Sequence, residues 1–177
     1  MSYDKNSEVI GKYIVAFIES AGEVSPVFER KMQNMFDERI GTVNADEWYD
    51  TESVVETYQQ VLSEVGEQSV MKAGQQNAVV VQPPADEGLK AALEHLNEEH
   101  RQAFRDSHKE YPAGRYTFDI QERDAHLGVD NDYPFPRPFV HGFYQKFIDL
   151  YGPGDSSADL DETAPRPNEQ FAWEATW

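Results

Sequence analysis

Hydrophobic side chains recur at helical spacing through the first two thirds of the chain. Their stripes predict helices over residues 7–20, 26–40 and 54–65, and a longer helix from about Asp86 to Glu110. Glycines follow the first three stripes at Gly22, Gly41 and Gly66, as is typical of helix ends. Ser25–Pro26 has the residue types preferred at a helix start. This part of the chain is therefore predicted to be helical.

Two segments between these stripes are less regular. Residues 67–82 contain Ala78–Val81, which suits either a strand or the buried end of a helix, and Pro83–Pro84 closes the segment in both cases. The aromatic pair Trp48–Tyr49 is predicted to fill part of the core. The acidic residues around this pair are expected to cap the helix that follows.

The period of the pattern changes to two after Gly114, which indicates strands. Tyr116, Phe118 and Ile120 alternate with polar residues, Leu127 and Val129 predict a hairpin partner, and residues 171–177 alternate in the same way. Between the hairpin and the last strand, prolines lead into a helix with an apolar and aromatic inward face: Val140, Phe143, Tyr144, Phe147 and Tyr151. Residues 152–168 are polar and rich in proline and glycine, so we expect a mobile acidic loop there.

Helices that precede a hairpin, a further helix and a last strand are typical of an α+β fold. We therefore expect N-terminal helices packed with a small C-terminal antiparallel sheet. The length of 177 residues matches an ordinary single domain, so residues 1–177 are predicted to form one α+β domain.

Charge narrows the range of partners. The chain has 33 Asp and Glu against 15 Lys and Arg, which gives a formal net charge of −18. Binding to nucleic acid or to an anionic membrane needs a basic patch, so we expect neither as a partner. The acids are spread along the whole chain, and molar salt screens the repulsion among them, so we expect a protein of a salt-in halophile. The alternative is an acidic protein of ordinary salinity with a basic partner.

Two further features bound the class of protein. The sequence has no stretch of 18 apolar residues, and its N-terminus lacks the apolar core of a signal peptide, so we expect a cytoplasmic protein. The lack of cysteine excludes disulfides, thiolate zinc sites and thiol catalysis.

Histidine provides the main candidate chemistry. His95 and His100 are five residues apart on the predicted helix, so they diverge and do not form a zinc-binding pair. His100 lies on the apolar stripe. There, a neutral imidazole can contact a ligand or haem iron, or can be a core residue bonded to a carbonyl or a tyrosine hydroxyl. Gly142, inside an apolar helix, predicts close approach by a neighbouring backbone or a bound molecule.

Several short motifs, taken together, resemble a known superfamily. They are Gly11–Tyr13, Trp48–Tyr49 before a helix, Pro138–Phe143 at the entry of a helix, and Gln170–Trp177 as a closing strand. The superfamily contains the haem-nitric-oxide/oxygen (H-NOX) domains, the 4-vinyl-reductase domains and related transport-particle subunits. The resemblance covers most of the chain, and it implies the α+β fold and a ligand pocket.

The resemblance also implies where haem would be held. H-NOX domains place Tyr, Ser and Arg in alternation before this helix, and Tyr133, Phe135 and Arg137 occupy those positions here. The family's proximal histidine would fall between His100 and His108. Because Phe135 lacks the serine hydroxyl and no histidine matches, we expect no cofactor, with haem as the alternative.

We therefore expect a non-catalytic small-molecule-binding or sensory module that recognises an unidentified small molecule or protein. One alternative is a structural or interaction protein that acts as a homodimer and fills its core with its own aromatic side chains. The other alternative is a haem-based gas sensor. Seven residues are predicted to surround one ligand pocket: His100, Phe104, Phe118, Tyr133, Arg137, His141 and Phe143.

Overall fold

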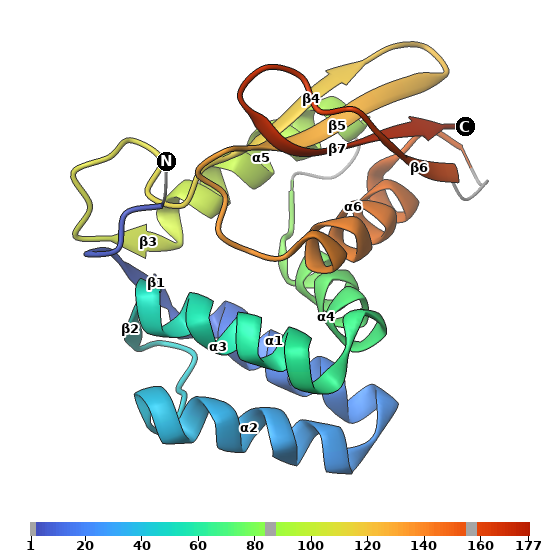
Figure 1. Cartoon of the computed structure of the whole chain (residues 1–177). Helices are drawn as coiled ribbons and strands as arrows, with labels where there is room; N and C mark the ends of the chain where they lie inside the picture. Colours follow the sequence, from blue (N-terminus) through green and yellow to red (C-terminus); the bar gives the residue numbers. More distant parts are fainter. Residues whose placement is uncertain (1–2, 84–87, 155–158) are drawn as a thin grey trace.

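The computed structural model describes residues 3–83, 88–154 and 159–177. The N-terminal helices lie at one end of the molecule and the larger antiparallel sheet lies at the other, with two further helices beside it, so the predicted α+β class is confirmed (Figure 1). The helices are α1 (Gly11–Val24), α2 (Pro26–Ile40), α3 (Thr51–Val65), α4 (Glu67–Val80), α5 (Gly88–Gln102) and α6 (Arg137–Tyr151).

The strands form two antiparallel sheets. The smaller sheet has the order β2-β1-β3 and comprises β1 (Glu8–Ile10), β2 (Trp48–Asp50) and β3 (Phe104–Arg105). The larger sheet has the order β4-β5-β7-β6 and comprises β4 (Tyr116–Ile120), β5 (Asp124–Asp130), β6 (Asp159–Thr163) and β7 (Glu169–Thr176). Helix α6 packs against the larger sheet, where Tyr144 meets Trp173 at a ring distance of 5.9 Å.

The predicted helix caps are confirmed. The Ser25 side chain accepts a hydrogen bond from the backbone amide of Val27 at the start of α2, and Asp50 does the same for Ser53 at the start of α3. Each cap satisfies an amide that the helix itself leaves without a partner. Of the aromatic pair predicted to fill the core, Tyr49 is buried, whereas Trp48 is only partly buried and lies under the guanidinium of Arg105.

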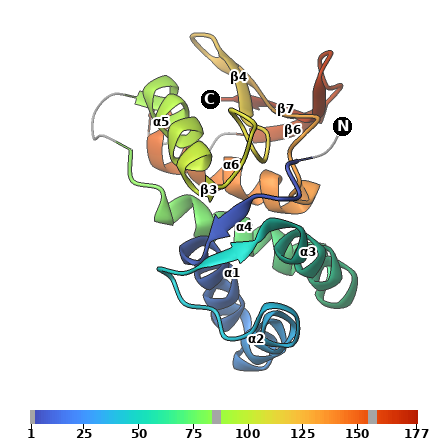
Figure 2. The ribbon, with the colours of Figure 1, turned by 90° about the vertical axis from the view of Figure 1, so that its left-hand side faces the viewer.

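Helices α4 and α6 lie side by side and touch through glycine (Figures 1 and 2). A Cβ on Gly142 would overlap the carbonyl oxygen of Met71, and a Cβ on Gly74 would overlap that of Phe139. The close approach predicted at Gly142 is thus confirmed, and a neighbouring helix backbone causes it. This contact holds α6 in place behind the cavity described below.

The structure corrects the predicted boundaries of two helices. The first stripe begins with β1, and α1 continues through Gly22 to Val24 because Ser25 ends it. The longer helix ends at Gln102 and not near Glu110, because Phe104 and Arg105 pair with β1 instead.

Two other segments also become clear. The irregular segment 67–82 is helical as far as Val80. The loop prediction over 152–168 was wrong at Asp159–Thr163, which forms the edge strand β6, because β7 provides backbone partners to a segment whose own side chains are polar. Residues 155–158 of the predicted loop lie outside the described residues.

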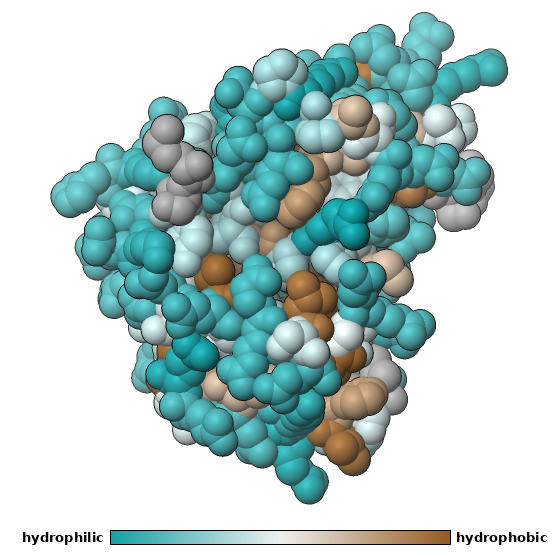
Figure 3. Space-filling view, in the orientation of Figure 1, coloured by the Kyte–Doolittle hydropathy of each residue, from teal (hydrophilic) through white to brown (hydrophobic). Residues whose placement is uncertain are grey.

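The visible surface is mostly hydrophilic, with hydrophobic residues in separate patches (Figure 3). The large hydrophobic residues that are most exposed in the described chain are few: Val27, Phe28, Val79 and Leu150. None of the described helices combines the length and the apolar character needed to cross a lipid bilayer.

Candidate functional site

A small cavity of about 50 Å³ lies where the helices meet the two sheets. The helical end of the molecule contributes the apolar walls Val9 of β1 and Val54 of α3. Helices α5 and α6 contribute Leu96 and Phe143 on the other side. The polar atoms in the wall belong to uncharged side chains: Tyr13, Tyr58, Asn77, His100, Tyr116 and Tyr133.

Local periodicity explains how these side chains reach the cavity. On α5, Leu89, Leu93, Leu96 and His100 recur at helical spacing and are all buried. On β4, alternation turns Tyr116 inward.

His100 is a buried, neutral imidazole. Its exposed fraction is 9%, and its Nε2 lies 3.1 Å from the carbonyl oxygen of Ala113. A carbonyl only accepts, so Nε2 carries the proton and donates it. Burial lowers the pKa of His100 to about 4, although the hydrogen bond to Ala113 acts in the opposite direction. The ring stacks on Tyr133 and meets Tyr116 edge-on, at ring distances of 5.4 Å in both cases.

Two tyrosine hydroxyls form a pair in the wall of the cavity. The oxygens of Tyr116 and Tyr133 lie 2.7 Å apart, and either hydroxyl can be the donor. Burial is the main cause that raises the pKa of both phenols, so both stay protonated near neutral pH.

Four of the seven predicted site residues line this cavity. They are His100, Phe104, Tyr133 and Phe143.

The other three predicted site residues lie elsewhere. Phe118 is two positions beyond Tyr116 on β4, past the reach of the cavity. Arg137 forms an ion pair of 3.0 Å with Glu162 and shares a separate cleft of about 290 Å³ with His141. Successive helix residues turn by about 100°, which carries these two side chains away from the face of α6 that bears Phe143.

No family model and no curated protein matches the sequence. Solved H-NOX domains, in contrast, match nearly the whole chain. A structure from a study of haem distortion in the H-NOX family superposes with a TM-score of 0.68 at 11% identity, covering 94% of both chains.

Two further structures agree. A mutant H-NOX domain of T. tengcongensis gives a TM-score of 0.62 at 10% identity, covering 93% of this chain and 94% of that one. An oxygen-binding H-NOX domain related to soluble guanylate cyclases gives 0.58 at 11% identity over 94% of both chains. The chain has an H-NOX-like fold. The resemblance predicted from the motifs is therefore confirmed at the level of the fold.

Within this H-NOX-like fold, Tyr58 is a cavity residue that sequence reasoning missed. It lies on the regular apolar stripe of α3, so the pattern identified it as buried. The pattern did not indicate which other helices and strands the buried face of α3 would contact. Val9 and Asn77 were missed for the same reason, because each comes from a separate element that only the tertiary fold brings to the cavity.

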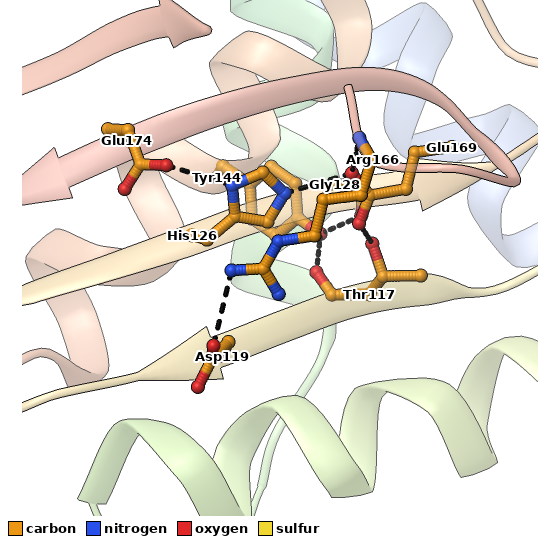
Figure 4. Close-up of polar contacts among 8 residues, drawn as sticks. All are labelled: Thr117, Asp119, His126, Gly128, Tyr144, Arg166, Glu169 and Glu174. Atoms are coloured by element: carbon orange, nitrogen blue, oxygen red, sulfur yellow. Dashed lines mark hydrogen bonds and ion pairs between the residues drawn. The ribbon is translucent and has the colours of Figure 1, made fainter. Parts of the chain in front are cut away.

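A second buried histidine, His126, lies on the larger sheet (Figure 4). It does not line the cavity. Nδ1 of His126 lies 2.9 Å from a carboxylate oxygen of Glu174, and Nε2 lies 2.9 Å from one of Glu169. Both contacts are hydrogen bonds to carboxylates only if both nitrogens carry protons, that is, in the imidazolium form.

Glu169 collects further donors. Its carboxylate accepts from the Thr117 hydroxyl at 2.6 Å and from the backbone amide of Arg166 at 2.8 Å. Burial acts to raise the pKa of Glu169, but the bonds from Thr117, His126 and Arg166 outweigh it and lower this pKa. The cluster thus ties strands β4, β5 and β7 to the turn before β7. No group of His, Asp and Glu in the described residues is arranged to hold a metal ion.

Proposed function

We propose that this H-NOX-like protein is a non-catalytic sensory module that binds a small, uncharged molecule in the cavity, without haem. The cavity carries the proposal. Protein cores have few voids larger than a water molecule, whereas this one measures about 50 Å³. That is room for about two to four waters.

The position of the cavity supports a sensory role. A ligand there would touch β1 and α3 on one side and α5, β4 and α6 on the other. A ligand that fits one arrangement of these elements better than another shifts the balance between them. Binding would in this way change how the helical end meets the end that carries the larger sheet.

Haem is the first ligand to consider, since a similar H-NOX structure was studied for haem distortion. The residues here do not fit it. The cavity is about 50 Å³, whereas pockets for drug-sized ligands measure roughly 300–1,000 Å³.

The side chains that would hold haem are also engaged or unsuitable. Nε2 of His100 donates to Ala113, and Arg137 pairs with Glu162 outside the cavity. Phe135, between Tyr133 and Arg137, offers no hydrogen-bond donor. These observations support a smaller ligand.

Xenon tests the proposal because it fills apolar cavities without needing a hydrogen bond. We expect xenon to shift the methyl NMR signals of Val9, Val54 and Leu96. Ala103→Val, which adds bulk to a residue that lines the cavity, should abolish these shifts. Ala92→Val is the matched control, because Ala92 is equally buried but does not line the cavity.

Two outcomes would contradict the proposal. If xenon leaves these methyl signals unchanged, the core is filled by its own side chains, and the dimeric interaction protein becomes the better hypothesis; native mass would then show the dimer. If purified protein takes up haemin and shows a Soret band that His100→Ala removes, the haem-based sensor is correct.

We further propose that the protein is adapted to high salt, which its acidic composition supports. A net charge of −18 repels itself at low ionic strength. We expect the unfolding temperature to rise markedly between about 0.1 and 2 M KCl, because the screening length falls from about 10 Å to below 3 Å. Calorimetry at several KCl concentrations measures this, and a flat or falling response would favour an acidic protein of ordinary salinity.

A further inference from the structure

The Tyr58 hydroxyl is a buried donor without a partner. Only 2% of Tyr58 is exposed, and its ring meets Phe17, Phe135 and Phe139 at ring distances of 4.2, 5.1 and 6.0 Å. The described residues provide no hydrogen bond to its oxygen. A buried hydroxyl in this state has no bond within the protein to replace the one that it made with water in the unfolded chain.

This hydroxyl borders the cavity. Within the described residues, the only fully enclosed side-chain nitrogen or oxygen without a partner is Nε1 of Trp173. The unpartnered oxygen of Tyr58 therefore keeps contact with open space, and the space that Tyr58 lines is the cavity.

The Tyr116–Tyr133 pair supplies a second unused donor. The two hydroxyls share one hydrogen bond of 2.7 Å, and the described residues offer no other acceptor to either of them. Two hydroxyls carry two hydrogens, and only one of these lies between the oxygens. The remaining hydrogen is free to reach a ligand.

The cavity offers free phenol hydroxyls but no charge. Burial raises the pKa of Tyr58, so its hydroxyl keeps the proton that it would donate. No charged side chain of the described residues lines the cavity. An anionic ligand would lose its hydration without meeting a cation, which is costly in an apolar site. A purely apolar ligand would leave the free hydroxyls without acceptors.

We infer that the ligand is a small uncharged molecule with an oxygen acceptor, such as an ether or carbonyl oxygen, which accepts a hydrogen bond from Tyr58. The free hydrogen of the Tyr116–Tyr133 pair is the second donor. This inference rests on the proposed function, since it specifies the ligand of the same cavity.

Dimethyl ether and propane are suitable probes. They match in shape and number of heavy atoms, and differ by an oxygen in place of a methylene. Each is titrated into the wild type and into Tyr58→Phe, with the methyl signals of Val54 and Leu96 as the readout. The affinity of each probe is compared between the two proteins, so the free energy of dehydrating that probe cancels.

We expect Tyr58→Phe to weaken dimethyl ether binding about 3- to 10-fold, the effect of one neutral hydrogen bond. Propane binding should change by less than about 2-fold, because it makes no such bond. Tyr144→Phe is the matched control: Tyr144 is a buried tyrosine whose hydroxyl bonds to the Gly128 carbonyl and which does not line the cavity. It should leave both affinities unchanged.

Stability provides a readout that needs no ligand. Tyr58→Phe should be as stable as the wild type or more stable, because it removes a hydroxyl that has no partner. Tyr144→Phe should be less stable, because it leaves a buried carbonyl without its donor. A clear loss of stability in Tyr58→Phe would show that its hydroxyl is already bonded, and would overturn the inference.

Failure of the inference differs from failure of the proposed function. If xenon and propane bind but Tyr58→Phe weakens dimethyl ether no more than propane, the cavity binds ligands and the assignment of the acceptor is wrong. If neither xenon, propane nor dimethyl ether shifts the methyl signals of the wild type, the proposed function itself fails.

Discussion

Two histidines are buried to a similar degree in opposite surroundings. His100 is 9% exposed and His126 is 6% exposed. His100 lies among aromatic rings at the cavity, and its one described hydrogen bond goes to a backbone carbonyl. His126 lies between the carboxylates of Glu169 and Glu174. Equal burial therefore does not imply an equal role, because one ring lies among aromatic side chains and the other lies between two carboxylates.

The two regions also differ in what holds them together. His100 is surrounded by aromatic rings that border the cavity. An uncharged ligand in this cavity would displace no ion pair, because no charged side chain of the described residues lines it. The surroundings of His126 are hydrogen bonds that cross the strands of the larger sheet and reach the turn at Arg166 (Figure 4). The first region is the site of the proposed ligand, and the second is a structural tie of the sheet.

The largest effect is expected when the tie loses its histidine. His126→Leu leaves the carboxylate of Glu169, 6% exposed, facing an apolar side chain. Removing a hydrogen-bond donor from a buried carboxylate is strongly destabilising, so we expect the free energy of unfolding at pH 7 to fall by about 3 kcal/mol. Urea denaturation measures this. A loss below about 1 kcal/mol, the size of an exposed ion pair, would mean that the two carboxylates do not depend on His126.

The second-largest effect is expected from acid, which should lower the stability of the protein through His100. The pKa of His100 is about 4 in the folded protein, against about 6.5 in an unfolded chain. As the pH falls, the unfolded chain takes up the proton before the folded protein does, which favours unfolding. The stability that the neutral His100 contributes is therefore fully present above about pH 6.5 and is lost as the pH falls towards 4. We expect a loss of about 2 kcal/mol over this window.

His100→Phe isolates that contribution, since the lowered pKa of Glu169 gives a loss of the same sign in both proteins. The variant should lose less stability than the wild type between pH 6.5 and pH 4.5. Urea titrations at the two pH values measure the difference. Equal losses in the two proteins would show that His100 is not held neutral by its surroundings.

The smallest effect is expected at the rim of the tie. Arg166 and Asp119 form an ion pair of 3.2 Å whose side chains are 49% and 48% exposed. Arg166→Ala should change the free energy of unfolding by less than about 0.5 kcal/mol, because water and salt screen such pairs. The backbone amide of Arg166, which donates to Glu169, remains in the variant. A loss above about 1 kcal/mol would extend the tie to this side chain.

Part of the site could be predicted from local spacing. Helical periodicity placed His100 on the buried face of α5, and alternation placed Tyr116 on the inward face of β4. Phe104 lines the cavity as expected, although from β3 and not from a helix. Arg137 and His141 were assigned to the same pocket, and the rotation of α6 separates them from it.

His126 shows the limit of such reasoning. Its partners Glu169 and Glu174 are more than forty positions further along the chain. The register of β5 against β7 places Glu174 opposite His126, and the shift of that register between Val129 and Asp130 lets Glu169 reach the same ring.

The sequence by itself determined the buried face of most helices and strands, where most of them lie, and that the fold is α+β, because these follow from the spacing of apolar residues along short stretches. It also determined the acidic surface. The tertiary structure alone decided which buried faces meet around the cavity and which acids meet His126. Those outcomes depend on packing angles and strand register between segments far apart in the chain, and no local pattern encodes them.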